Sequence, residues 1–191
     1  MHGTAARTPA TRKTHAALEL RQSRRTLQLL RASGAIMLLS GASWALFFGW
    51  HGAHVVAATE AALALLGLAV LLAARPQRVR PVAWLAFAGI FAFLCVFSAL
   101  LDVPTTQIPR SSHLFLLVLA ACAHHVFRGE PAALRYGFLV LVLATFVALA
   151  AQPQSTPPAF AIPDPLRRGA IWANLGIVAA SLLVVLSLIH I

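Results

Sequence analysis

Six long apolar runs dominate this chain, and they constrain its fold more than any other feature. The runs cover residues 35–52, 55–74, 82–101, 112–127, 135–151 and 169–189. A helix needs about 20 apolar residues to cross ~30 Å of bilayer hydrocarbon. Closed barrels also satisfy their backbone groups in lipid, but their strands are shorter, about 9–11 residues, and alternate in polarity. We therefore expect an all-α integral membrane protein, a bundle of six transmembrane helices.

The segment before these runs, residues 1–34, is basic and polar. It holds seven of the 15 Lys and Arg residues of a chain whose net charge is +10. We expect a cytoplasmic tail that is disordered to about residue 14 and meets anionic lipid headgroups rather than nucleic acid. Residues 15–31 mix leucine with arginine, so either a short helix on the headgroups or continued disorder fits them.

The distribution of basic residues predicts the orientation in the membrane. Twelve of the 15 Lys and Arg residues lie in the tail and in the two linkers 75–81 and 128–135, which share one side of a six-span chain. Cytoplasmic loops are the ones enriched in Lys and Arg. We therefore expect a multi-pass protein of the bacterial cytoplasmic membrane with both termini inside. The central linker, LDVPTTQIPRSSH at 101–113, then faces out, and only Arg110, Arg167 and Arg168 share its side.

Motifs of soluble enzymes are absent. The chain has no P-loop, GxGxxG, GxSxG or HExxH, and its two cysteines, Cys95 and Cys122, lie inside apolar runs without metal-ligand spacing. We expect no catalytic residue, no bound cofactor and no enzymatic activity in the chain as given.

Polar residues on the outer side are the candidates for ligand binding or sensing. Glu60 lies about five residues into the second run, where an ionisable group is expensive unless it has a role; the alternative is a carboxyl that reaches water or a neighbouring hydroxyl. Asp102, His113 and Asn174 are the other candidates. His51 and His54 form an HxxH pair that could join nearby carboxylates at a metal, although loop histidines are more often simply solvated.

The last six residues, LSLIHI at 186–191, are suspect. The codons CTG TCT CTT ATA CAC ATC encode them, and this string resembles a transposon end used in preparing sequencing libraries. We expect these residues to be translated adapter and the gene to continue beyond them. The alternative is that they complete the sixth span.

Four segments together suggest a family. They are GASWALFF (41–48), EAALALLGLAVLL (60–72), FAFLCVFSALLDVPTTQIPRSSHLFLL (91–117) and IPDPLRRGAIWANL (162–175). This pattern, over about residues 34–185, resembles the N-terminal six-helix sensor regions of bacterial signalling proteins that carry a cytoplasmic cyclic di-GMP domain. That domain is of EAL phosphodiesterase type or, less often, GGDEF cyclase type.

The resemblance implies a membrane-anchoring, sensory domain that transmits an extracytoplasmic or membrane signal to a missing cytoplasmic domain. A histidine kinase parent is an alternative within this class, and a second copy of the chain is a candidate partner by analogy. From another class, a complete small integral membrane protein such as a transporter or channel subunit also fits. That class usually shows polar residues near the midplane.

Overall fold

The computed structural model describes residues 9–156, 158 and 160–190, with the side chains of 24, 26–156, 158, 160–183 and 187. All regular secondary structure in these residues is helical, which confirms the predicted all-α class. The α-helices are α1 (Pro9–Trp50), α2 (His54–Ala73), α3 (Val79–Val96), α4 (Phe115–Val126), α5 (Ala132–Ala150) and α6 (Asp164–His190). Short turns of other helix types are η1 (Pro76–Arg78), η2 (Phe97–Leu101), η3 (Ser112–Leu114) and η4 (Phe127–Gly129).

Five helical stretches are long and apolar enough to cross a membrane. They are Thr26–Trp50, His54–Ala73, Pro76–Leu101, Ser112–Gly129 and Ala132–Ala150. Their surfaces expose large apolar side chains such as Leu46, Leu72 and Val140. Exposed apolar surface of this kind is unfavourable in water and favourable in lipid. This pattern suggests membrane insertion. The sixth helix, α6, has 27 residues but is not among these five, so the predicted count of six spans stays a prediction.

Helix α1 begins earlier than predicted, because residues 9–14, expected to be disordered, are helical. Pro9 suits a first helical position, where its missing N–H has no partner to lose. Residues 10–33 contain no further proline and no glycine and are rich in Ala, Leu and Arg, which favour helix. The helix continues through residues 15–31 into the first apolar run without a break. Residues 1–8 lie outside the described part of the chain.

Helix α6 also begins earlier than predicted, at Asp164 rather than residue 169. Pro165 falls in the first turn of α6, where proline is tolerated. Asp164 at the N-terminus interacts favourably with the helix dipole. As a result Arg167 and Arg168 lie on the helix rather than in a loop. The adapter hypothesis for residues 186–191 stays a prediction, since residue 191 and all but one of these side chains lie outside the description.

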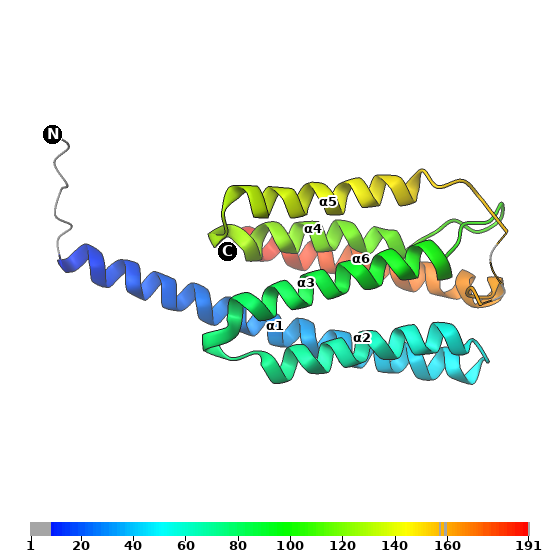
Figure 1. Cartoon of the computed structure of the whole chain (residues 1–191), viewed down its shortest axis with the longest axis horizontal. Helices are drawn as coiled ribbons and strands as arrows, with labels where there is room; N and C mark the ends of the chain where they lie inside the picture. The colour runs from blue at the N-terminus through cyan, green and yellow to red at the C-terminus, as the bar shows by residue number, and fades with distance from the viewer. Residues whose placement is uncertain (1–8, 157, 159, 191) are drawn as a thin grey trace.

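The closest helix packing is between α2 and the second half of α1, which run antiparallel, while the first half of α1 projects beyond the bundle (Figure 1). A Cβ atom added to Gly41 would lie 2.6 Å from the backbone nitrogen of Ala64, and one added to Gly67 would lie 2.5 Å from that of Leu38. Glycine at these two positions lets the backbones touch, as small residues do in membrane helix pairs.

The connections alternate between the two ends of the bundle (Figure 1). The turn at 51–53, the central loop (residues 102–111) and the linker before α6 lie at one end, which we call the central-loop end. The connections between α2 and α3 and between α4 and α5 lie at the other end, with the C-terminal end of α6. The main apolar core lies between these ends and includes the fully buried Val70, Leu116 and Val142.

Candidate functional site

Asp102 is the centre of a buried polar network at the central-loop end. It follows the π-helical turn η2, and its backbone N–H donates to the carbonyl of Phe97 at 2.9 Å. Carboxylate oxygen Oδ2 accepts the backbone N–H groups of Ser111 and Ser112, each at 2.9 Å. One carboxylate therefore closes the central loop by joining its first residue to its last and to the start of η3.

Arg167, in the first turns of α6, pairs with the same carboxylate. Its Nε donates to Oδ1 of Asp102 at 3.1 Å, and both side chains are almost fully buried. One terminal nitrogen donates to the carbonyls of Ile108 at 3.2 Å and Pro109 at 3.4 Å. The other reaches the more exposed Asp164 at 3.5 Å. A single arginine thus links α6 to both the acid and the backbone of the central loop.

Two further contacts join these segments or the residues just before them. The backbone N–H of Ile162 donates to the carbonyl of Leu101 at 3.0 Å. Further along α6, the Asn174 amide donates to the hydroxyl of Ser111 at 2.9 Å. Nearby, the hydroxyls of Ser98 and Ser112 share a buried hydrogen bond of 2.8 Å. The central loop is therefore attached to α6 from Arg167 to Asn174, over about two helical turns.

Arg110 occupies the other side of the central loop. It is 6% exposed, and three of its five N–H donors have partners among the described residues. Its Nε donates to the backbone carbonyl of Asp102 at 3.0 Å, and its terminal nitrogens donate to the carbonyl of Leu149 and to the side-chain oxygen of Gln152, the latter at 2.7 Å. Arg110 thereby ties the loop to the end of α5.

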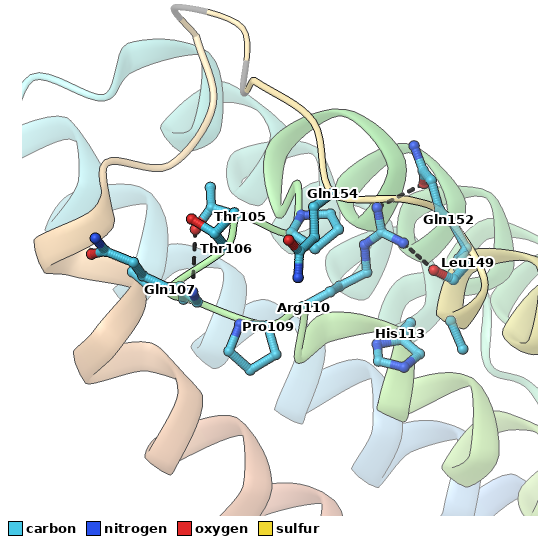
Figure 2. A pocket seen from close by; sticks show the side chains of 12 residues that line it. Thr105, Thr106, Gln107, Pro109, Arg110, His113, Leu149, Gln152 and Gln154 are labelled. Atoms are coloured by element: carbon cyan, nitrogen blue, oxygen red, sulfur yellow. Dashed lines mark hydrogen bonds between the residues drawn. The ribbon is translucent and has the colours of Figure 1, made fainter.

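A cavity of about 370 Å³ opens beside Arg110 (Figure 2). Its walls come from the central loop, η3 and the end of α5 with the linker that follows. His113 lines it, with its ring stacked on Phe146 at a centroid distance of 5.2 Å. The Nδ1 atom of His113 is buried and has no described hydrogen-bond partner.

The structure brings some of the predicted candidates together and leaves others apart. Asp102 and Asn174 belong to one network, and His113 lies at the adjoining cavity. Glu60 is elsewhere: it is buried in α2 on the face toward α1, 6% exposed, with no ion pair among the described residues. His51 and His54 are exposed, and no three His, Cys, Asp or Glu side chains cluster as a metal site in the described part of the chain.

The two arginines of this site were not predicted from the sequence. Arg110 and Arg167 were counted only as exceptions on the side that is poor in basic residues. Such an exception is itself informative, because a cation that does not serve orientation needs a local reason to be there. Gln152 lies in a proline-rich linker, and no feature of the sequence marked it as a site residue.

Comparison with known proteins found no relative of this chain. The chain matches no protein-family model, no curated protein and no solved structure at a significant level.

Proposed function

We propose that this chain is the membrane-anchoring, sensory domain of a bacterial signalling protein. In this proposal the chain crosses the cytoplasmic membrane six times, with both ends inside. The central loop detects a signal at the outer face, and α6 passes it to a cytoplasmic cyclic di-GMP domain of EAL type or, less often, GGDEF type. The basic N-terminal part of α1 lies against anionic headgroups.

One observation carries the proposal: the central loop and α6 are joined through the Arg167–Asp102 ion pair and the Asn174–Ser111 hydrogen bond. The backbone bond from Ile162 to Leu101 joins the residues that precede them. The loop is the segment that a signal outside the membrane would reach. Helix α6 is the segment that would lead to an output domain. A ligand can shift a conformational equilibrium only through contacts that differ between two states, and these bonds are contacts that such states could make or break.

The orientation is tested by reporter fusions. A phosphatase that is active only after export should be active when fused after Gln107, in the central loop, and inactive when fused after Arg78, in the connection between α2 and α3. The reason is the excess of Lys and Arg around Arg78. Phosphatase activity after Arg78 and none after Gln107 would show the reverse orientation, in which α6 leads out of the cell.

The output domain is tested by sequencing genomic DNA downstream of the codon for Val185. We expect an open reading frame that enters an EAL or GGDEF domain within about one hundred residues, since the helix that leaves the membrane should connect to it directly. A stop codon within a few residues would contradict the proposal. It would favour a complete small membrane protein, such as a transporter or channel subunit.

A further inference from the structure

The cavity beside Arg110 has the dimensions and lining of a small-molecule site. Its volume of about 370 Å³ lies at the lower end of the roughly 300–1,000 Å³ typical of ligand pockets. The lining combines apolar surface from Pro109 and Leu149 with hydroxyl and amide groups from Thr106, Gln107 and Gln154 (Figure 2). Thr106, Gln107 and Gln154 are solvent-exposed, so their polar groups border the open side of the cavity.

The charge of Arg110 is not balanced by its own partners. All three of its described acceptors are neutral, two backbone carbonyls and one side-chain amide. The carboxylate of Asp102 is held by Arg167 and two backbone N–H groups. In the central loop and the first turns of α6, three arginines (110, 167 and 168) stand against two aspartates (102 and 164), which leaves one excess positive charge.

The unbalanced positive charge stays on the buried Arg110. Burial lowers the pKa of Arg110, the Asp102 charge opposes this change, and the Arg167 charge adds to it. Arginine nevertheless stays protonated in proteins, so the unbalanced cation persists. A buried charge is stable when a counter-charge and hydrogen bonds satisfy it. Two N–H donors of Arg110 have no described partner, and Arg110 forms part of the cavity wall.

A second unsatisfied group lines the same cavity. The Nδ1 atom of His113 is buried without a described partner, and stacking on Phe146 holds the ring in place. A neutral imidazole nitrogen can donate or accept, depending on its tautomer. Arg110 and His113 thus line one small cavity with unused hydrogen-bonding capacity and a net positive charge.

We propose that this cavity binds a small, singly charged carboxylate, and that this carboxylate is the signal of the sensor, a role that rests on the proposed function. The carboxylate oxygens accept from the free N–H groups of Arg110, an arrangement that guanidinium geometry favours. One excess positive charge selects a monoanion, since a second negative charge would meet Asp102 nearby. The amide of Gln154 is available to a hydroxyl or amino group on the ligand, whereas the amide oxygen of Gln107 accepts from Arg168 at 3.3 Å.

The test measures binding to the full chain, purified in nanodiscs of zwitterionic lipid. The probes are sodium acetate and sodium lactate, with acetamide and sodium chloride as uncharged and non-carboxylate controls. We expect acetate or lactate to raise the thermal unfolding temperature and to give a calorimetric binding signal, and the controls to do neither. If neither carboxylate binds, or if chloride does equally well, the proposal is wrong.

The deciding variant is Gln152→Glu, which places a carboxylate on Arg110 at the position of the present amide oxygen, 2.7 Å away. This built-in counterion should weaken carboxylate binding about tenfold or more, equivalent to at least 1.4 kcal/mol, and raise the unfolding temperature without ligand. Thr156→Glu is the matched control: it adds the same charge to the same linker at an exposed residue outside the cavity wall, and binding should stay within about twofold.

Equal binding by wild type and Gln152→Glu would overturn the proposal. Should Gln152→Glu not fold, Gln154→Glu brings the same charge to the exposed edge of the cavity and should weaken binding in the same direction. A lipid phosphate is the alternative counterion for Arg110. If nanodiscs with phosphatidylglycerol stabilise the chain while the soluble carboxylates have no effect, the cation is satisfied by lipid and the proposal fails. Binding is measured independently of any output domain, so the genomic test of the proposed function can succeed or fail separately.

Discussion

Replacing Asp102 by asparagine should lower the free energy of unfolding by about 3–5 kcal/mol, the range for breaking a buried ion pair. Asparagine keeps the shape and one acceptor oxygen for the N–H groups of Ser111 and Ser112. It removes the charge opposite Arg167, whose side chain is 2% exposed, and leaves a buried guanidinium without its main counterion. The measurement is unfolding by SDS titration in mixed micelles.

Asp164→Asn provides the matched control, because Asp164 is the other carboxylate that touches Arg167. Its side chain is 42% exposed and 3.5 Å away, so its loss should lower stability by less than about 1 kcal/mol. The double variant Asp102→Asn with Arg167→Leu should recover part of the loss from Asp102→Asn alone, since removing both charges leaves no buried ion unpaired. Equal effects of Asp102→Asn and Asp164→Asn would show that burial of the Asp102 pair is not what stabilises the network.

Gly41→Ala should destabilise the chain by about 1–3 kcal/mol, the usual range for overpacking. The added methyl group would lie 2.6 Å from the backbone nitrogen of Ala64 and 2.7 Å from the backbone oxygen of Glu60. Backbone atoms cannot rotate away as a side chain can, so α1 and α2 must separate along part of their contact. The same SDS titration measures the loss, and Gly67→Ala should behave alike because its added methyl group would lie 2.5 Å from Leu38 N.

Gly137→Ala makes the same chemical change on α5, where nothing lies within 4 Å of the added atom. It should be neutral or stabilise the chain by up to about 1 kcal/mol, because alanine favours helix over glycine. A loss at Gly137 as large as at Gly41 would mean that the effect comes from the helix itself and not from the contact between α1 and α2.

The helical class and most helix positions could be predicted because apolar run length is a strong, local property. The helix ends were harder. The first turns of α1 and α6 contain Pro9 and Pro165. From the sequence alone, a proline in the first turn of a helix is hard to distinguish from a proline in a loop. The same ambiguity concealed Arg167, which the early start of α6 places on the helix.

The candidate site could be predicted in Asp102 and Asn174 and in His113 of the adjoining cavity, but not in its arginines. Asp102 and Asn174 attract attention because polar residues at the edge of an apolar run are unusual. Their partners could not be read from the sequence, because Asp102 and Arg167 are 65 positions apart and Arg110 and Gln152 are 42 apart. Such pairings depend on how the helices pack, which no local pattern records. Glu60 drew attention for the same reason as Asp102 but lies apart from the network, in the contact between α1 and α2.

The attachment of α6 has a mechanical consequence. Hydrogen bonds and the Arg167–Asp102 pair fasten its first turns to the central loop, while among its described side chains only Arg167 and Val178 are buried. With 27 residues, the helix is about 40 Å long at a rise of 1.5 Å per residue. The part of α6 beyond Asn174, the last residue described as bonded to the central loop, extends for about 24 Å, so a tilt of about 5° at Asn174 moves the far end of the helix by roughly 2 Å.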